Sequence, residues 1–495
     1  MRYDYAVIGA GVSGMSAAIL LAQKGCRTAL VEKSNTTGPT IRGFIRNGVV
    51  FDTGFHYTGG LEEGEPLDRF FRYLGLSGKI EKIRFERNGV DLFRCREPSF
   101  EFSVPLGLEN VRAELNRAFP HEEKAVAAYL EIISDAYHRL PYINLDGEMT
   151  SLALPFSIHE ESLAEVLDRL TSNSLLKSVL SMYCLLHGVP PGEVPMTNHA
   201  SVAAPYYESA HRIAGGGRKL AEAFAERLVE TGVDVYCGSN AKELLLSETE
   251  QIAGIRLEDG RTIECTGSIA TVHPTSLFEI VPQRTFPPAY RKALARLEDT
   301  SSAIILFGIC GEPVELLRHK NIFAFPSARS DFDDTEGMIE GSPLYITGTA
   351  TERNDQDRAG FIAICPTPHT GSGVWSRIPH TRAGDYDRFK KEVSSRLRAY
   401  VEAVIPELKG NIIEVECATP HTLKRFTNSP TGSLYGVKHR VGQLNPMPAT
   451  KIRNLYLAGQ AVTGPGILGA MVSAFLACGY IVGHETLRRE LRQCP

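Results

Sequence analysis

Hydrophobic residues near the start of the chain fall into a strand, helix, strand order. The apolar run at 5–8 predicts a buried parallel strand, because strands covered on both faces read as continuous hydrophobic stretches. A helical pattern follows over 15–24, and a second apolar strand covers 27–31. This order predicts a βαβ unit, in which the helix packs across one face of a parallel sheet.

Three glycines, Gly9, Gly11 and Gly14, join the first strand to the helix. Gly9 permits the tight turn, Gly11 lets the backbone approach a pyrophosphate, and Gly14 lets helix and strand pack closely. The phosphates of a dinucleotide would then lie at the helix N-terminus, where free N–H groups favour negative charge. Glu32 ends the second strand, where a carboxylate can accept hydrogen bonds from a ribose hydroxyl. An ordinary glycine-rich turn is the alternative, and it leaves Glu32 unexplained.

Further along the chain, two more blocks have a similar organisation. The segment 61–205 that precedes them has mixed helical periodicity, with amphipathic or buried helices predicted at 162–170 and 175–186. The second block starts at a glycine run, and its predicted elements are a helix at 219–231, a strand at 233–236, a hairpin of 252–257 with 262–265, and a strand at 268–272. The third block has a strand at 452–458, a Gly/Pro turn and a helix from Ile467 onward.

These blocks alternate with material of another kind. Dinucleotide-type segments occupy 1–60, 206–275 and 415–490, and the segments 61–205 and 276–414 lie between them. We therefore predict an α/β fold with two domains that each use discontinuous sequence. A ligand cleft is expected at the interface of the two domains, where small-molecule sites commonly form.

The composition narrows the class of protein. Of the 495 residues, 43% are hydrophobic and 22% are charged, as in ordinary globular proteins. The net charge of −5 argues against a dedicated nucleic-acid binder, which would usually show a basic patch or stripe. The ten cysteines include no CxxC pair, which argues against a zinc knuckle, and scattered single cysteines fit a reducing cytoplasm.

Signals for export or membrane insertion are not expected. The first strand begins almost at residue 1, which leaves no room for a signal peptide. The most apolar run, 468–483, is shorter than the roughly twenty residues that a spanning helix needs, so a core helix is the favoured interpretation. We therefore expect a cytoplasmic protein.

Four blocks of the sequence resemble the phytoene desaturase, carotenoid isomerase and retinol saturase group of FAD-dependent oxidoreductases, within the wider amine-oxidase-like flavoproteins. They are the glycine unit that ends at Glu32, FDTGFHYTGGLEEG at 51–64, the glycine run at 215–217 with the strand through Val235, and NLYLAGQAVTGPGILGAMVSA at 454–474. The second block is most similar to all-trans-retinol saturases. Two positions depart from the family: Gly38-Pro39-Thr40 replaces a common glycine pair, and Gln460 replaces a common acid.

The resemblance implies a Rossmann-like FAD-binding domain with an inserted α+β substrate domain. FAD would contact the first block and also the last, where the helix that begins near Gly466 can stabilise negative charge on the N1/C2 carbonyl region of a reduced flavin. A C-capping glycine at Gly459 and a core helix are the alternative interpretation of the last block. The residues expected to bind FAD are Gly9, Gly11, Val12, Ser13, Gly14, Glu32, Lys33, Val235, Gly459, Gln460, Gly466, Ile467 and Leu468.

The chemistry is expected to come from the cofactor. The sequence has no second complete GxGxxG unit for a nicotinamide cofactor, no nucleophile elbow, and no cysteine and histidine spacing typical of a metal site. The flavin would therefore carry the hydride, and the protein would position the substrate, exclude water from the site and supply one proton. The electron partner of the flavin is left open among a soluble donor, a quinone, oxygen and the substrate itself.

The proton donor has several candidates. His56 and Tyr57 follow the segment 52–54, which the resemblance places near the flavin, and we rank them first. The remaining candidates share an aromatic hydroxyl and are Tyr206, Tyr207 and Tyr435. Each candidate can instead be an aromatic packing residue with a satisfied polar tip. Three histidines are interpreted as structural or surface groups: His187, His273 and His421.

The predicted function is oxidoreduction of carbon–carbon double bonds in an apolar polyene or isoprenoid, in the saturase direction. A carotenoid or phytoene desaturase and a cis–trans isomerase are the alternatives on the same scaffold. An amine oxidase, which an aromatic cage would favour, is a more distant alternative, and a flavin-binding protein without turnover is the non-enzymatic one. Since the substrate would arrive from lipid, peripheral contact with the inner face of a membrane is also considered.

Overall fold

The computed structural model describes residues 2–86, 89–147, 160–282, 285–328, 339–349, 359–377 and 383–494. The predicted βαβ unit is present, as β1 (Arg2–Ile8), α1 (Val12–Gln23) and β2 (Thr28–Val31). β1 and β2 pair in parallel, with Ile8 opposite Val31 at their carboxyl ends. α1 begins at Val12 rather than at Met15, because Gly11 has the extended backbone of a helix N-cap and the turn enters the helix directly.

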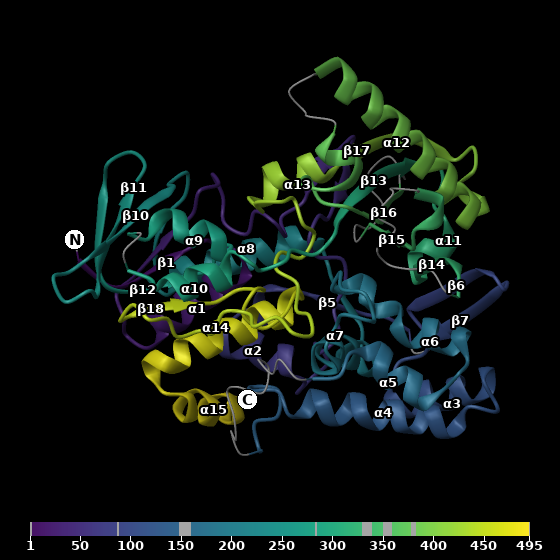
Figure 1. The fold of residues 1–495 in the computed structure, drawn as a ribbon, viewed down its shortest axis with the longest axis horizontal. Coiled ribbons are helices and arrows are strands. Elements are labelled where there is room, and N and C mark those ends of the chain that lie inside the picture. Colours follow the sequence, from purple (N-terminus) through teal and green to yellow (C-terminus); the bar gives the residue numbers. More distant parts are fainter. Residues whose placement is uncertain are drawn as a thin grey trace.

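A mixed sheet collects strands from three distant parts of the chain (Figure 1). Its order is β10-β11-β12-β1-β2-β9, with β18 beside β12. β12 (Thr262–Ala270) is antiparallel to β11 and parallel to both β1 and β18. The other strands of this sheet are β9 (Asp234–Tyr236), β10 (Ala241–Leu246), β11 (Ile252–Leu257) and β18 (Leu455–Leu457).

The predicted hairpin between β11 and β12 is confirmed, but one strand was divided wrongly. The prediction treated 262–265 and 268–272 as two strands, whereas β12 is continuous. From the sequence alone, Gly267 suggests the end of a strand. In the structure, a Cβ at this position would lie 2.5 Å from the Tyr5 ring. The glycine therefore serves a close approach of β12 to β1, and it does not end the strand.

α14 (Gly466–Val482) packs against α1 in the interior, and both helices have long buried stretches. Ser13 fixes this contact, because its hydroxyl donates a hydrogen bond to Ala470 O at 2.7 Å. Within the part of the chain that the structure describes, no helix is long and apolar enough to cross a membrane. The other helices near this sheet are α2 (Pro66–Leu74), α8 (Gly216–Glu230), α9 (Pro274–Ile280), α10 (Pro288–Leu294) and α15 (His484–Gln493).

A second sheet has the order β17-β13-β16-β15-β14-β6-β7. β6 and β14 pair in parallel, and the other neighbours are antiparallel. Its strands are β6 (Asp91–Glu97), β7 (Phe100–Val104), β13 (Ser302–Cys310), β14 (Asn321–Ser327), β15 (Leu344–Gly348), β16 (Ala359–Thr367) and β17 (Ile412–Ala418).

The two faces of the second sheet pack against different layers. Leu306 shares a hydrophobic cluster with Leu397 of α12 (Ala383–Val404), which covers the outer face. Ile305 and Phe307 belong instead to the large central cluster. This alternation follows the two-residue period of a strand, and it directs one row of apolar side chains toward the first sheet.

A layer of helices lies beside the second sheet, at the lower right of Figure 1. It comprises α3 (Leu108–Ala118), α4 (Glu123–His138), α5 (Leu163–Leu170), α6 (Ser174–Ser181) and α7 (Met196–Glu208). The smaller elements are β3 (Phe44–Arg46), β4 (Val49–Phe51), β5 (Lys82–Arg84), β8 (His211–Ile213), α11 (Glu315–His319), α13 (Pro420–Thr427) and the 3-10 helices η1 (Ser77–Lys79), η3 (Met182–Leu186), η4 (Ile339–Gly341), η5 (Gly373–Ser376) and η6 (Pro406–Leu408). The predicted helix at 162–170 is confirmed, and Ser162 and Glu165 form a capping box at its start.

Candidate active site

A cavity of about 1620 Å³ is lined by residues from both sheets. On one side it meets the carboxyl ends of β1, β2 and β18, at Ile8, Val31 and Ala458. On the other side it meets β13, through Ile305 and Phe307. Ligands of open α/β sheets bind outside the carboxyl ends of the strands, so this cavity is the candidate site.

The glycine turn between β1 and α1 lines the cavity at Gly9 and Gly11. Gly9 has a φ of +99°, and a Cβ there would lie 2.5 Å from Thr271 Oγ1. A Cβ on Gly14 would overlap Gly9 O, so helix and strand pack too closely for a side chain. A Cβ on Gly11 would meet no protein atom within 4 Å. The packing of the protein does not require glycine at position 11, whereas a ligand close to the backbone would require it.

Glu32 lies just after β2 and also lines the cavity. Its Oε2 accepts a hydrogen bond from Ala10 N at 2.6 Å, and its Oε1 accepts one from Ser34 N at 2.7 Å. Each carboxylate oxygen keeps a second lone pair, so the side chain can fix the turn and still accept from a ribose hydroxyl. Three predicted neighbours also line the cavity: Val12, Ser13 and Lys33.

The last block lines the cavity at Gly459, Gln460, Gly466 and Ile467. Gly459 follows β18 and therefore caps no helix, which removes the alternative interpretation of this glycine. Its N–H donates a hydrogen bond to Ser473 Oγ at 2.7 Å and so ties the end of the strand to α14. α14 starts without a side-chain cap and without an acidic residue in its first turn. Its first N–H groups are therefore suited to a ligand that carries negative charge.

Three predicted FAD contacts lie outside the wall of this cavity: Gly14, Val235 and Leu468. Val235 is on the exposed edge strand β9, and Leu468 lines a smaller apolar cavity next to the large one. Ser239 and Asn240 line the cavity instead, after the carboxyl end of β9. The sequence analysis missed these two residues, although the same rule on strand ends could have found them.

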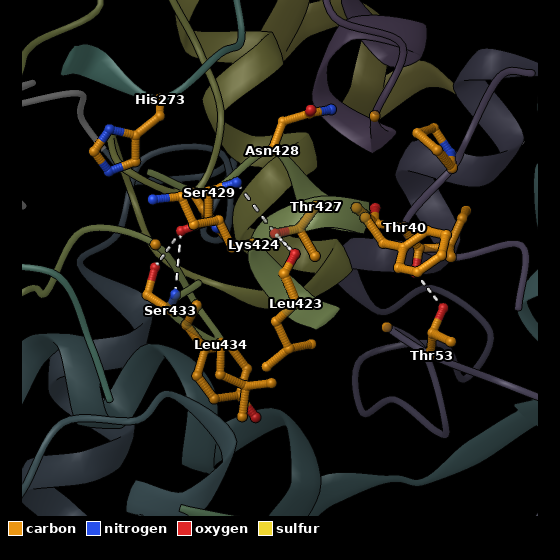
Figure 2. A pocket seen from close by; sticks show the side chains of 18 of the residues that line it. Thr40, Thr53, His273, Leu423, Lys424, Thr427, Asn428, Ser429, Ser433 and Leu434 are labelled. Carbon is orange, nitrogen blue, oxygen red and sulfur yellow. Dashed lines mark hydrogen bonds between the residues drawn. The ribbon is translucent and has the colours of Figure 1, made fainter. Parts of the chain in front are cut away.

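α13 and the loop that follows it form a further wall of the cavity (Figure 2). Leu423 and Leu434 present apolar side chains there, next to polar groups. Ser429 and Ser433 are hydrogen-bonded to one another at 2.8 Å, which helps to hold the loop. The wall therefore offers apolar side chains to a ligand, while the Ser429 and Ser433 hydroxyls are bonded within the loop.

His56 and Tyr57 both line the cavity, as predicted for candidate acids. Burial, together with the nearby Arg212 guanidinium, lowers the pKa of His56 to about 4, although the residue as a whole is only partly buried. The imidazole is therefore neutral near neutral pH. Tyr57 is buried, and its hydroxyl donates a hydrogen bond to Asp91 Oδ2 at 3.0 Å.

Asp91 is a fully buried acid that the sequence analysis missed. It is the first residue of β6 and lies opposite Asn321 in the neighbouring strand β14. Its carboxylate accepts hydrogen bonds from Tyr57, from Tyr183 at 2.9 Å and from Asn321 at 2.9 Å. Burial raises the pKa of Asp91 to about 6, against the lowering effect of these hydrogen bonds. No motif marked this residue, because it lies in the segment 61–205.

The three remaining tyrosine candidates have different positions. Tyr206 lines the cavity, and its ring packs on Tyr57 with 4.8 Å between the centroids. Tyr435 also lines the cavity, and its hydroxyl donates to Leu185 O at 3.0 Å. Tyr207 is buried outside the cavity wall and contributes to packing.

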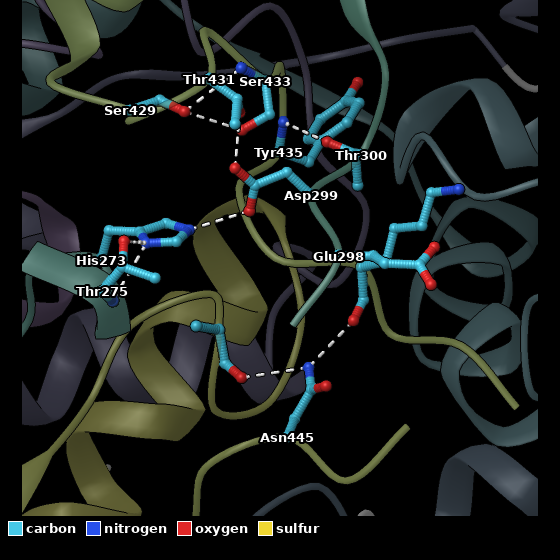
Figure 3. Close-up of polar contacts among 12 residues, drawn as sticks. His273, Thr275, Glu298, Asp299, Thr300, Ser429, Thr431, Ser433, Tyr435 and Asn445 are labelled. Atoms are coloured by element: carbon cyan, nitrogen blue, oxygen red, sulfur yellow. Dashed lines mark hydrogen bonds and ion pairs between the residues drawn. The ribbon is translucent and has the colours of Figure 1, made fainter. Parts of the chain in front are cut away.

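His273 lines the cavity and also makes structural contacts of the kind that the sequence analysis expected. Its ring caps the start of α9, and its Nε2 lies 2.9 Å from Asp299 Oδ1 (Figure 3). Thr431 donates a hydrogen bond to the other oxygen of Asp299 at 2.5 Å. These contacts connect the end of the first sheet with the loop before the last block.

Cys184, His187 and His199 are buried together, with their possible ligand atoms within 4.8 Å of one another. Hydrogen bonds account for this cluster. Val189 N donates to His187 Nδ1, so the proton of the neutral His187 ring lies on Nε2 and points to His199 Nδ1 at 3.3 Å. His199 Nε2 then faces the Tyr129 hydroxyl at 3.2 Å. His187 is therefore accounted for as a structural group.

Comparisons with known proteins agree with these features. The profile of the family described as Flavin containing amine oxidoreductase matches residues 12–482. The chain is 24% identical to the all-trans-retinol 13,14-reductase of Rattus norvegicus, over 97% of this chain and 86% of that protein. It is 23% identical to the 4,4'-diapophytoene desaturase (4,4'-diaponeurosporene-forming) of Staphylococcus aureus strain MRSA252, over 93% of this chain and 94% of that protein.

The fold also has a close counterpart among solved structures. Wild-type putrescine oxidase bound to putrescine aligns with a TM-score of 0.65 at 12% identity, over 100% of this chain and 99% of that one. At this identity the likeness concerns the fold alone. It confirms the predicted α/β class, and the sequence matches confirm the resemblance drawn from the four blocks.

Proposed function

This chain belongs to the flavin-containing amine oxidoreductase family, and we propose that it is an FAD-dependent oxidoreductase of apolar polyenes or isoprenoids that acts in the saturase direction. One observation carries the proposal: a single cavity joins the glycine turn at Gly11 to a chamber of apolar and aromatic side chains. A dinucleotide cofactor and an apolar chain can therefore meet in one cavity.

The residues of the first and last blocks fit FAD. Gly9, Gly11 and the start of α1 would hold the pyrophosphate, and Glu32 would bind the ribose. The start of α14 at Gly466 suits the negative charge of a reduced flavin ring. We propose the same cofactor contact for the other predicted residues in the cavity wall, Val12, Ser13, Lys33, Gly459, Gln460 and Ile467. When bound, reduced FAD supplies a hydride.

The chamber next to the glycine turn suits an apolar substrate. Its walls include Phe44, Ile305, Phe307, Ile364 and Leu434. Removing these surfaces and an apolar chain from water together favours binding. An apolar ligand that fills the chamber would also displace water from it.

We propose a division of the chain into two domains that follows the two sheets. The FAD-binding domain comprises 1–60, 206–275 and 415–490, and the substrate-binding domain comprises 61–205 and 276–414. In support, the first sheet draws its strands from the first set of ranges. β17 pairs with β13 in the second sheet, so the last boundary is better placed after β17.

His56 and Tyr57 are the proposed catalytic residues. Both line the chamber, and Tyr57 carries a hydroxyl proton that could pass to a substrate carbon. Burial raises the pKa of Tyr57 well above its ordinary value, so the hydroxyl keeps its proton until a strong base forms beside it. The neutral His56 ring can donate one hydrogen bond to a bound substrate.

An amine substrate is disfavoured by charge. Arg212 is 8% exposed, and no carboxylate of the described residues forms an ion pair with it. Its positive charge acts on His56 in the cavity wall, where it lowers the pKa of the imidazole. A cationic amine at the same place would be repelled, whereas an uncharged polyene would not.

The absorbance spectrum of the purified protein tests the proposal, because an oxidised flavin absorbs near about 370 and 450 nm through its own chemistry. After anaerobic reduction, all-trans-retinol should reoxidise the flavin if the protein is a saturase. If it is a desaturase, 4,4'-diapophytoene should instead bleach the oxidised flavin. Gly11→Val is the matched control and should show neither response. A protein without flavin that also fails to bind added FAD would refute the proposal.

A further inference from the structure

We propose that Asp91 is a proton reservoir for Tyr57, the donor that faces the substrate chamber. This inference rests on the proposed function and adds a residue that lies outside the cofactor blocks. Asp91 touches neither the chamber nor the cofactor contacts, so it is a positioning residue that acts through Tyr57.

The geometry around the acid is unusual for a structural carboxylate. Asp91 is 0% exposed and forms no ion pair with any described residue. Tyr57 and Tyr183 donate to Oδ2 at 3.0 and 2.9 Å, and Asn321 Nδ2 donates to Oδ1 at 2.9 Å. Because no described cation lies within ion-pairing distance, the three hydrogen bonds must replace most of its hydration, and a buried carboxylate is costly under these conditions. Retaining an acid here requires a reason beyond packing.

Tyr57 is the link between this acid and the chamber. It lines the cavity, whereas Tyr183 and Asn321 lie behind the wall. Asn321 continues the network away from the chamber, since its Oδ1 accepts from Thr347, whose hydroxyl in turn faces Arg212. A proton on Asp91 can therefore reach the substrate through the Tyr57 hydroxyl.

The step balances as a net addition of two hydrogens. The π bond of the substrate breaks as one carbon receives a hydride, for which reduced flavin is the reductant. The neighbouring carbon takes the Tyr57 hydroxyl proton, and a second C–H bond forms. The Tyr57 oxygen regains a proton from the Asp91 carboxylic acid, which leaves a carboxylate. Solvent returns a proton to Asp91 between turnovers.

The surroundings of Asp91 both raise and lower its pKa. Burial favours the protonated acid, whereas the three hydrogen bonds and the charge of Lys320 favour the carboxylate. Arg212 also lies close enough to interact with Asp91. The balance raises the pKa of Asp91 to about 6, within reach of neutral conditions. The other titratable groups that sense its charge are Tyr57, Tyr183, Tyr206, Tyr207 and Tyr345.

The decisive variant exchanges the carboxyl and the amide between neighbouring strands. In Asp91→Asn/Asn321→Asp, the amide oxygen at position 91 can still accept from both tyrosines, and its NH₂ can donate to the new carboxylate. That carboxylate can still accept from Thr347, which now donates to Asn321 Oδ1 at 2.7 Å. The exchange keeps the hydrogen-bond pattern and moves the acid out of contact with Tyr57.

The first readout is the single-turnover rate at which all-trans-retinol reoxidises the reduced flavin of the FAD-loaded protein. We expect the wild-type rate to fall as the pH rises through about 6, because the reservoir loses its proton. In Asp91→Asn and in the exchanged variant, the rate should no longer fall as the pH rises through about 6, and below that pH it should be about 10²-fold lower than in the wild type. Asp91→Glu should keep the fall in rate. Wild-type rates and an unchanged pH profile in both variants would overturn the proposal.

The second readout needs no turnover. Infrared difference spectra of the purified protein, recorded before substrate is added, should contain a carboxylic acid C=O band that disappears as the pH rises through about 6. Buried Asp52 contributes a band of its own, because its pKa is raised to about 7, so the Asp91 band is identified as the part of the signal that Asp91→Asn removes and Asp52→Asn leaves in place. If the wild type converts no polyene, the proposed function fails, and this band still tests the reservoir. An Asp91 that stays ionised across the titration would overturn it.

Discussion

Asp52 accepts a hydrogen bond from the Gly217 backbone N–H at 2.8 Å, and this bond joins two segments that are separate blocks in the sequence. A Cβ on Gly216 would lie 2.5 Å from Asp52 Oδ2, and one on Gly217 would overlap Ile41 O. The glycine run therefore lets the start of α8 approach Asp52. The second and third blocks of the family resemblance are two halves of one packing contact.

Asp52 should make stability depend on pH. Burial raises its pKa to about 7, against the lowering effect of the Gly217 N–H and of Arg212. An aspartic acid in the unfolded chain has a pKa of about 3.9. The protonated Asp52 of the folded protein therefore contributes its full stabilisation below that pH, and this stabilisation is lost as the pH rises through about 7. Asp52→Asn keeps the acceptor and removes the titration. Thermal unfolding measures the melting temperature of Asp52→Asn minus that of the wild type, and we expect this difference to be larger at about pH 7 than at about pH 4.

The control for this prediction is Asp52→Ala, which removes the acceptor and should be less stable than Asp52→Asn at both pH values. A difference between Asp52→Asn and wild type that does not change with pH would contradict the prediction. It would mean that the carboxyl is ionised throughout, with Arg212 close enough to offset its burial.

A side chain at Gly11 should weaken FAD binding and leave folding intact. Its Cβ would meet no protein atom within 4 Å, and its φ of −71° suits any L residue. We expect Gly11→Val to unfold within about 0.5 kcal/mol of wild type in the absence of FAD, as surface changes do, and to retain little flavin on purification. Gly14→Ala is the contrasting variant, because its Cβ would overlap Gly9 O and should destabilise the protein itself. Equal destabilisation of both variants would argue against a cofactor at Gly11.

Glu32 should matter to the turn as well as to the cofactor. Its two oxygens accept from Ala10 N and Ser34 N, and a glutamine has only one oxygen to offer. Glu32→Gln therefore leaves one N–H unsatisfied, at a cost of about 1–3 kcal/mol in the free energy of unfolding. Chemical denaturation with and without FAD measures this cost. Lys33→Gln, which changes a neighbouring group in the cavity wall, is the control and should leave the flavin-free stability unchanged.

The cofactor side of the site could be predicted because its chemistry is local in the sequence. Gly9, Gly11 and Glu32 belong to one βαβ unit, and their spacing corresponds directly to positions around a helix N-terminus. Val235 shows the limit of that approach. The strand was predicted, but the residues that line the cavity come after the strand ends, beginning at Ser239. Hydrophobic periodicity locates a strand more reliably than it locates the residue at which the strand ends.

Asp91 could not be predicted because its surroundings depend on strand register. Asp91 and Asn321 are 230 residues apart, and they meet because β6 and β14 pair in parallel. The residues that flank Asp91 and Asn321 in the sequence contain no pattern from which the pairing of the two strands could be predicted. A buried acid at the start of an apolar strand reads in the sequence as an ordinary strand boundary, and the partner strand decides whether it becomes part of a network.

Tyr57 and Tyr206 line the same chamber with ring centroids 4.8 Å apart, but their hydroxyls have different surroundings. Tyr57 Oη donates to Asp91, whereas Tyr206 Oη makes a long contact of 3.4 Å with Tyr57 O. Tyr57→Phe should slow the reoxidation of reduced flavin by all-trans-retinol about 10²-fold, and Tyr206→Phe should change it less than about threefold. Both replacements keep the ring, so a similar loss in both would indicate packing and not proton transfer. A loss in neither would assign the proton to His56, and His56→Gln would then be the variant that slows the reaction.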